Sequence, residues 1–249
     1  IAGDATVALV FRHLQPLSDR DRDALIAFAQ AQDFAIFLQP GGVDSVQALW
    51  PQDPPLSFAL PQWDVELKFR PLDFIQVNAK LNEAMIARAL ELLDVQPGER
   101  VLDLFCGLGN FTLPLARASG DGEVVGVEGD AGLVQRARAN AAHNGLGNVT
   151  FHAADLVQDL AGQPWLKAGF DKVLLDPARA GAIDVLKQLP LKVLKRIVYV
   201  SCHPGSLARD AGYLVNDAGW TLREAGVMDM FPHTAHVESI AVFDPPKKR

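Results

Sequence analysis

Several features that define other classes of protein are scarce or absent in this 249-residue sequence. Its two cysteines, Cys106 and Cys202, are too few for a disulfide scaffold or for a metal site built from cysteines. No apolar run approaches the ~18 residues that a membrane-spanning helix needs. The amino terminus also lacks the charged and then apolar segments of a secretory signal. We therefore expect a cytoplasmic protein that does not associate with membranes.

The sequence also lacks an excess of positive charge. Its 23 lysines and arginines are outnumbered by 30 aspartates and glutamates, which gives a formal net charge of −7. Because nucleic-acid phosphates are held by clustered cations, this acidity argues against a phosphate-binding surface spread over the whole molecule. What is present is an ordinary globular composition, 49% hydrophobic and 21% charged, which excludes disordered and low-complexity chains.

The pattern of the sequence changes near residue 72. Residues 1–72 contain one helical stretch, from Ser18 as its N-cap to about Gln32, with Asp21 placed to complete a capping box. Short strand-like runs separated by prolines and glycines surround it, at 5–12, 34–39, 46–50, 56–60 and 65–69. This pattern predicts a small N-terminal α+β domain over residues 1–72 and a second domain over residues 73–249.

Strands and helices alternate through residues 73–249. We expect helices at 80–93, 111–118, 131–143 and 206–216, and strands at 100–105, 123–128, 149–152, 172–175, 197–200, 221–227 and 236–243. The last two strands are too close in sequence for a parallel crossover, so they should form an antiparallel hairpin. Alternating units closed by such a hairpin are typical of the α/β, Rossmann-like fold of class I S-adenosylmethionine-dependent methyltransferases.

A glycine turn follows the first strand of the second domain, in the run VLDLFCGLGNF over 101–111. Gly107 and Gly109 allow the backbone to approach a ligand closely. Asp103 can accept a hydrogen bond from an amine or a cation, Glu128 ends the second strand, and Asp155 follows the third. Because ligands of open α/β sheets bind at the carboxyl ends of the strands, acids at three successive ends predict a cofactor site.

The glycine turn has two other interpretations. The glycines can serve only a tight turn between strand and helix. A dinucleotide can also bind such a turn, but Thr112 stands where the third glycine of that fingerprint belongs. S-adenosylmethionine has no pyrophosphate to cradle, so it suits this turn better.

The expected strand at 197–200 runs directly into Ser201 and Cys202. This places Cys202 at the carboxyl edge of a central strand, although taken alone a buried, inert cysteine is the favoured interpretation. Asp176 ends the preceding strand, where it would lie beside both Cys202 and the cofactor and can recognise a hydrogen-bonding base. Its alternative role is to cap the next helix.

Gln76 and Glu238 complete the set of candidate residues. Gln76 precedes the first helix of the second domain, and its amide can both donate and accept hydrogen bonds, which suits recognition of an amide-like edge. Its alternative role is that of a turn residue. Glu238 enters an apolar strand near the carboxyl terminus, where a charged residue is often simply solvated.

Five segments resemble the RNA uracil-C5 methyltransferases: FIQVN at 74–78, VLDLFCGLGNFTLPLA at 101–116, LLDPARAG at 174–181, YVSCHPGSLARD at 199–210 and HVESIAVF at 236–243. Within that family they are most similar to the branch that modifies a uridine of 23S ribosomal RNA. Three alternatives stay open: the transfer-RNA branch, another class I methyltransferase, and a non-catalytic fragment that binds the cofactor.

The resemblance implies roles for the candidate residues. Cys202 matches the nucleophile that adds to uracil C6, Glu238 matches the base that removes the C5 proton, and Gln76 and Asp176 match residues that orient the uracil and border the cofactor. The positions that match S-adenosylmethionine contacts are Phe105, Asn110, Glu128 and Asp155, which join Gln76, Asp103, Gly107, Gly109 and Asp176. Ribosomal RNA is the implied substrate, and no metal site is implied within this chain.

The chain departs from the family pattern in two ways. His203 follows the nucleophile where the family usually has asparagine. The family also normally carries an N-terminal OB-type RNA-binding domain and a cysteine-ligated iron–sulfur cluster, whereas both cysteines here lie within the motifs above. We therefore expect the carboxyl-terminal part of a longer protein, with residues 1–72 left from its central domain. The iron–sulfur cluster is expected only in the missing N-terminal part, and the chain is expected to be a monomer.

Overall fold

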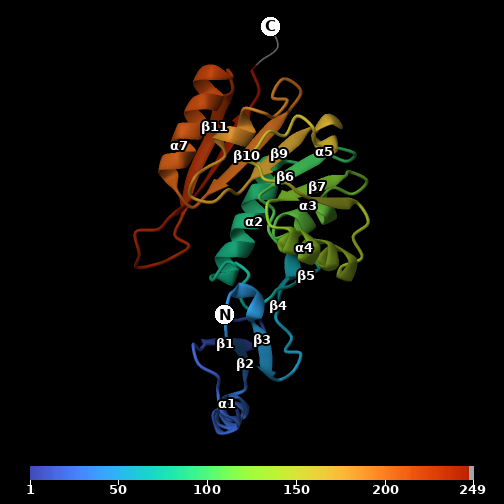
Figure 1. Cartoon of the computed structure of the whole chain (residues 1–249). Helices are drawn as coiled ribbons and strands as arrows, with labels where there is room; N and C mark the ends of the chain where they lie inside the picture. Colours follow the sequence, from blue (N-terminus) through green and yellow to red (C-terminus); the bar gives the residue numbers. More distant parts are fainter. Residues whose placement is uncertain (247–249) are drawn as a thin grey trace. The chain divides into compact units, whose positions relative to one another are not determined.

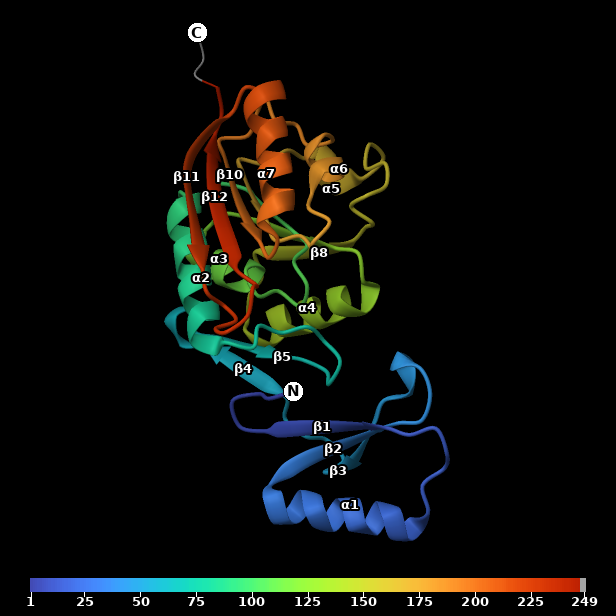
Figure 2. The same cartoon turned by 90° about the vertical axis from the view of Figure 1, so that its left-hand side faces the viewer.

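A computed structural model describes residues 1–246 of the chain (Figures 1 and 2). The chain divides into two units, Ile1–Ile75 and the residues from Gln76 onward, so the division falls slightly after the expected boundary at residue 72. The last three residues of the expected second domain, 247–249, lie outside the described part. None of the described helices is both long enough and apolar enough to cross a membrane.

The first unit has the predicted α+β composition. Helix α1 (Asp19–Gln32) begins after Ser18, whose hydroxyl accepts from the Asp21 backbone, and the Asp21 carboxylate accepts from the Ser18 backbone in return. The unit contains two sheets. One is formed by β1 (Val7–Arg12), β2 (Phe34–Gln39) and β3 (Gln47–Trp50), and the other by β4 (Ser57–Leu60) and β5 (Val65–Lys68). Two short 3₁₀ turns cover Val43–Ser45 and Pro61–Trp63. Strand β2 is parallel to β1 and antiparallel to β3, and α1 packs on this sheet through Ala29.

The second unit is built on one seven-stranded sheet in the order β11-β12-β10-β9-β6-β7-β8. Its strands are β6 (Val101–Leu104), β7 (Val124–Glu128), β8 (Val149–Ala153), β9 (Lys172–Leu175), β10 (Arg196–Ser201), β11 (Thr221–Met228) and β12 (Glu238–Asp244). Strands β6 to β10 are mutually parallel, while β12 runs antiparallel to both β10 and β11. The predicted hairpin of the last two strands is therefore confirmed.

Helices cover both faces of this sheet, and Figure 2 shows α2 and α7 on opposite sides of the strands. The helices are α2 (Ala79–Leu93), α3 (Thr112–Ala118), α4 (Ala131–His143), α5 (Pro164–Lys167), α6 (Ile183–Leu186) and α7 (Pro204–Gly212). Helices α5 and α6 are not predicted by the sequence, because four residues are too few to show helical periodicity. The helix expected at 206–216 begins at Pro204, and a π-helical segment, Tyr213–Asp217, forms its end.

Strand direction decides which residues share an edge of the sheet. The carboxyl ends of β6, β7, β8, β9 and β10 lie along one edge because these strands are parallel. Since β12 is antiparallel to β10, its first residue, Glu238, lies at the same edge. Ser201 of β10 pairs with Ser239 of β12. Cys202 follows Ser201 and Glu238 precedes Ser239, so both lie next to this pair at the same edge.

A buried carboxylate secures the turns at this edge. Asp210 of α7 is fully buried, and its Oδ2 accepts from the Tyr199 hydroxyl and the Ala182 backbone N–H, both at 2.7 Å. Its Oδ1 accepts from the Arg209 guanidinium at 2.7 Å. Gly181 has a φ of +82°, and a Cβ there would lie 2.7 Å from Asp210 Oδ2, so only glycine fits. These bonds tie α7 to β10 and to the loop after Asp176.

Replacement of this carboxylate should destabilise the fold. In Asp210→Ala the Tyr199 hydroxyl and the Ala182 N–H lose their acceptor in a buried place, which costs about 3 kcal/mol of unfolding free energy. Urea unfolding followed by circular dichroism measures the change. Asp217→Ala is the matched control, because Asp217 is exposed at the end of the same helical segment, and a change within about 0.5 kcal/mol is expected there. Equal stability of both variants would contradict the role given to Asp210.

Candidate active site at the carboxyl edge of the sheet

The turn after β6 has a backbone that leaves room for a ligand. Phe105, Gly107 and Gly109 all have positive φ, at +65°, +56° and +102°. A Cβ on Gly107 would meet nothing within 4 Å, whereas a Cβ on Gly109 would collide with the Leu113 side chain. Gly107 therefore faces open space, Gly109 is required by packing, and Phe105 is a strained non-glycine residue of the kind that clusters at functional sites.

Glu128 at the end of β7 faces this turn. Its Oε2 accepts from the Gly107 N–H at 3.1 Å, and its Oε1 accepts from the Asp130 N–H at 3.1 Å. Asp155 is exposed after β8, and its Oδ1 accepts from the Val157 N–H at 3.0 Å. Since β7 and β8 are parallel neighbours, both acids lie at the carboxyl edge, where the sequence analysis expected them.

Asp103 lies inside the fold behind the glycine turn. The Thr112 hydroxyl donates to its Oδ2 at 2.5 Å, while its Oδ1 is buried and has no partner among residues 1–246. Burial raises the pKa of Asp103 to about 8. A positive charge beside this carboxyl would favour its ionised form, in which both oxygens accept. The unpartnered Oδ1 next to a turn with open space therefore fits a ligand that brings an N–H donor and a positive charge. The residues present therefore fit S-adenosylmethionine, which has an ammonium group and a sulfonium.

Two other residues of the glycine turn are held by the protein itself. The Asn110 amide exchanges two hydrogen bonds with the amide of Asn82 on α2, at 2.9 and 3.0 Å, which fixes the turn to that helix. Cys106 is buried, and a Cβ on Gly126 of β7 would approach its Sγ to 3.0 Å. Burial raises the pKa of the Cys106 thiol well above its usual range, which disfavours the reactive thiolate, so Cys106 contributes to packing.

Cys202, Glu238 and Asp176 form an electrostatically linked group. Cys202 and Asp176 are half-buried and Glu238 is 4% exposed. Burial and the charge of Glu238 raise the pKa of Asp176 to about 7, and burial also raises the pKa of Glu238. Burial, Glu238 and Asp176 together raise the pKa of the Cys202 thiol. The solvated alternative for Glu238 is wrong, because β12 lies inside the sheet between β10 and β11.

Residues 2–244 match a family model described as tRNA (Uracil-5-)-methyltransferase. The chain belongs to this family.

Relatives within the family carry more specific names. The chain is 75% identical over 244 residues to the "23S rRNA (uracil(1939)-C(5))-methyltransferase RlmD" of Xanthomonas campestris pv. campestris strain 8004, a match that covers 98% of this chain and 54% of the relative. It is 69% identical to the protein of that name from Xylella fastidiosa strain Temecula1, over 98% of this chain and 55% of the relative. The chain thus spans about half the length of the curated relatives it matches.

Solved structures agree with the fold. The Pyrococcus abyssi tRNA (uracil-54, C5)-methyltransferase, in complex with S-adenosyl-L-homocysteine, superposes with a TM-score of 0.73 and 28% identity, over 95% of this chain and 55% of that one. The TYW2 protein of M. jannaschii, in complex with AdoMet, has a TM-score of 0.60 and 19% identity, over 85% of this chain and 93% of that one. At that identity the second likeness shows the fold alone.

The departure from the family pattern at the residue after Cys202 has a local explanation. His203 is the N-cap of α7, and its Nδ1 accepts from the Ser206 backbone N–H at 3.1 Å. Asparagine is a preferred N-cap because its side-chain oxygen accepts the same kind of bond, so histidine keeps the cap with a different acceptor atom. Asp176 caps no described helix, because the N-cap of α6 is Ala182.

Gln76 begins the second unit and is half-buried. Its Oε1 is buried and has no hydrogen-bond partner in the described part of the chain. An unpartnered amide oxygen is suited to an N–H of a bound ligand, as the recognition role inferred from sequence requires. That role stays a prediction.

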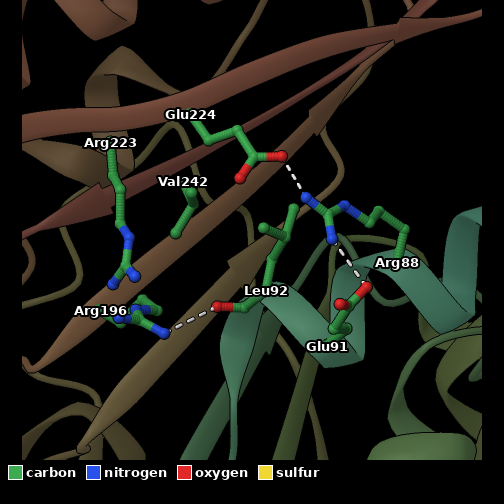
Figure 3. A pocket seen from close by; sticks show the side chains of 7 residues that line it. All are labelled: Arg88, Glu91, Leu92, Arg196, Arg223, Glu224 and Val242. Atoms are coloured by element: carbon green, nitrogen blue, oxygen red, sulfur yellow. Dashed lines mark hydrogen bonds and ion pairs between the residues drawn. The ribbon is translucent and has the colours of Figure 1, made fainter.

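A separate surface pocket lies between α2, the start of β10 and the hairpin of β11 and β12 (Figure 3). It is lined by Arg88, Glu91, Leu92, Arg196, Arg223, Glu224 and Val242. Arg88 pairs with Glu91 at 2.7 Å and with Glu224, and Arg196 donates to the Leu92 carbonyl at 3.0 Å. The ion pair between Arg88 and Glu224 joins α2 to the hairpin. Because the charges of this pocket already pair within the protein, the pocket is no part of the candidate site.

Sequence reasoning missed several residues that shape the site. Thr112 was considered only as an absent glycine, yet its hydroxyl holds Asp103. Asn82 gave no signal at all, because the helical pattern of α2 does not reveal that a buried amide meets Asn110. Arg179 and His236 lie within the motifs and receive no role from the sequence, but the Arg179 Nη2 lies 2.8 Å from the His236 Nδ1.

The raised pKa of Asp103 predicts a pH dependence of stability. The folded state keeps this carboxyl protonated up to about pH 8, whereas in the unfolded chain it ionises near pH 4. Its contribution to stability is therefore complete below about pH 4 and is lost as the pH rises toward 8. Asp103→Asn removes this titration. Between pH 5 and 8 the free energy of unfolding of the variant should therefore rise relative to that of the wild type, by at most about 1 kcal/mol per pH unit. Urea unfolding at pH 5, 6.5 and 8 tests this, and parallel profiles would refute it.

Proposed function

We propose that this chain is the catalytic part of an enzyme that methylates C5 of a uridine in 23S ribosomal RNA. The observation that carries the proposal is the placement of Cys202 and Glu238 at the ends of two paired strands, on the edge that also holds the glycine turn. A thiol beside a carboxyl of raised pKa is a pairing of nucleophile and base. The proposed substrate is supported by the names of relatives that are 69–75% identical over nearly the whole chain.

The chain's residues account for the chemistry that such a methylation needs. Uracil C5 is too weak a nucleophile to take a methyl group directly. In the proposed reaction the deprotonated Sγ of Cys202 adds to C6, and the electron pair of the C5–C6 double bond makes C5 an enolate carbon. After C5 is methylated, Glu238 takes the C5 proton, the double bond forms again, and Cys202 leaves with the electron pair of the C6–S bond.

Binding of the cofactor is assigned to the turn after β6 and its acidic neighbours. When bound, S-adenosylmethionine supplies the electrophilic methyl group. Asp103 would accept from its cationic end and Glu128 would accept from its ribose hydroxyls, with Gly107 leaving room for the ligand. Phe105, Gly109 and Asn110 shape the turn, and Asp155 lies where the adenine would be recognised.

Recognition of the uracil is assigned to Gln76 and Asp176. The free Oε1 of Gln76 is suited to the uracil N3–H, and Asp176, if protonated, can donate to a carbonyl oxygen because its pKa is raised to about 7. The uridine must leave its base stack to reach such a site. A monomeric state and a cytoplasmic location stay predictions.

The proposal predicts that methyl transfer depends on one thiol. Cys202→Ala should lose detectable transfer of labelled methyl groups from S-adenosylmethionine to a 23S ribosomal RNA fragment, because C5 is then never activated. RNA containing 5-fluorouridine should form a covalent adduct with the wild type, since the fluorine at C5 cannot be removed as a proton. Gel electrophoresis under denaturing conditions measures the adduct.

Two matched variants sharpen this experiment. Cys106→Ala should keep the adduct, because Cys106 is buried packing. Glu238→Gln should lower turnover by about 10²- to 10⁴-fold, since the base that completes the reaction is removed. Methyl transfer retained by Cys202→Ala would eliminate Cys202 as the nucleophile. Preference for a transfer-RNA fragment over the ribosomal fragment would favour the transfer-RNA branch.

Charge predicts a separation between cofactor and RNA binding. With a formal net charge of −7, this chain alone should bind RNA weakly, while its cofactor residues should bind S-adenosylhomocysteine. Isothermal titration calorimetry with each ligand at physiological salt measures both affinities. Tight RNA binding would contradict the first expectation, and absent cofactor binding would contradict the assignment of the glycine turn.

A further inference from the structure

Two side chains that the proposed mechanism does not use meet beside the nucleophile. Arg179 lies in the loop after β9, three residues beyond Asp176, and His236 lies in the loop before β12, two residues before Glu238. The Nη2 of Arg179 is 2.8 Å from the Nδ1 of His236. This bond joins the two loops that carry the acids flanking Cys202.

The chemistry of this contact fixes its direction. A guanidinium has only donors, so Arg179 donates and the Nδ1 of His236 accepts. The His236 ring is itself held, because Phe231 meets it edge to face with ring centroids 6.2 Å apart. Its backbone N–H donates to the Thr234 hydroxyl at 3.1 Å. These contacts orient the exposed ring of His236 as an acceptor for the long, exposed side chain of Arg179.

The charges around Cys202 determine how easily its thiol ionises, and Arg179 is one of them. Asp176 and Glu238 both disfavour a thiolate, and so does partial burial. Arg179 acts on the same thiol in the opposite direction and favours the thiolate. An exposed arginine that moves freely is screened by water, so its effect on Cys202 depends on the guanidinium being held nearby.

We propose that His236 is a positioning residue that holds the Arg179 guanidinium where it stabilises the Cys202 thiolate against the two neighbouring acids. This inference rests on the proposed function, in which that thiolate is the nucleophile. The thiol proton leaves to solvent, and the pair of residues lowers the free energy of the charged sulfur without taking part in any bond change. Asp176, Glu238 and Arg179 are the charged groups that act on Cys202, and Arg179 is the one that faces His236.

The test measures the titration of Cys202 without RNA or cofactor. The chain is alkylated with iodoacetamide at a series of pH values, because the thiolate is the reacting form. Trypsin separates the two cysteines into peptides 197–209 and 101–117, so mass spectrometry gives a rate for each. The rate at Cys106, which is buried, reports whether a variant remains folded.

Arg179→Met should move the midpoint of the Cys202 profile up by about half a pH unit, equivalent to about threefold slower alkylation at a pH below the midpoint. His236→Leu should cause a similar shift. His236→Asn should stay close to the wild type, because its Oδ1 offers an acceptor in the place of Nδ1. The double variant should shift no further than Arg179→Met alone, since both changes remove one effect. His233→Asn, in the same loop, is the control and should change nothing.

Other outcomes overturn the proposal. An unchanged midpoint in Arg179→Met would show that the guanidinium does not act on Cys202, and if only RNA binding fell, Arg179 would be an RNA contact instead. A shift in Arg179→Met but not in His236→Leu would remove the positioning role of His236. If Arg179→Met makes Cys106 reactive, Arg179→Gln replaces it. If the variants show these shifts but the wild type transfers no methyl group, the proposed function is contradicted, while the effect of Arg179 and His236 on the Cys202 thiolate stands.

Discussion

The pairing of β12 with β10 is the interaction on which the rest of the candidate site depends. Because β12 is antiparallel, its amino-terminal end meets the carboxyl-terminal end of β10, and Ser201 faces Ser239. The residues next to this pair at the same edge are Cys202, after β10, and Glu238, at the start of β12. A parallel strand at this place would carry Glu238 to the far edge of the sheet, away from Cys202.

Burial gives this arrangement its chemical character. Glu238 lies on an interior strand, so its carboxyl is removed from water, and Asp176 shares the same weakly solvated place. Low solvation raises the pKa of both acids and brings them closer to the range in which they exchange protons at neutral pH. The same effect disfavours the thiolate of Cys202, which is why a held cation such as that of Arg179 matters there.

The turn that carries Cys202 and the glycine turn are held by different buried polar groups. Asp210 fixes α7 and the loop after Asp176 through the Tyr199 hydroxyl and the Ala182 N–H. On the cofactor side, the paired amides of Asn82 and Asn110 hold the glycine turn against α2. Buried polar groups that are fully paired favour one geometry over others, which a preorganised site needs.

The sequence by itself determined the class of fold, the hairpin at the end of the sheet and the motifs that place Cys202, Asp176 and Glu128 at strand ends. It could do so because helical and strand periodicity, glycines and caps are local signals. Only the tertiary structure decided that β12 lies inside the sheet, that the oxygen of Asp103 is unpartnered, and that Arg179 meets His236. Those facts depend on contacts between residues far apart in the chain, where strand order and burial, and not local pattern, set the free energy of each group.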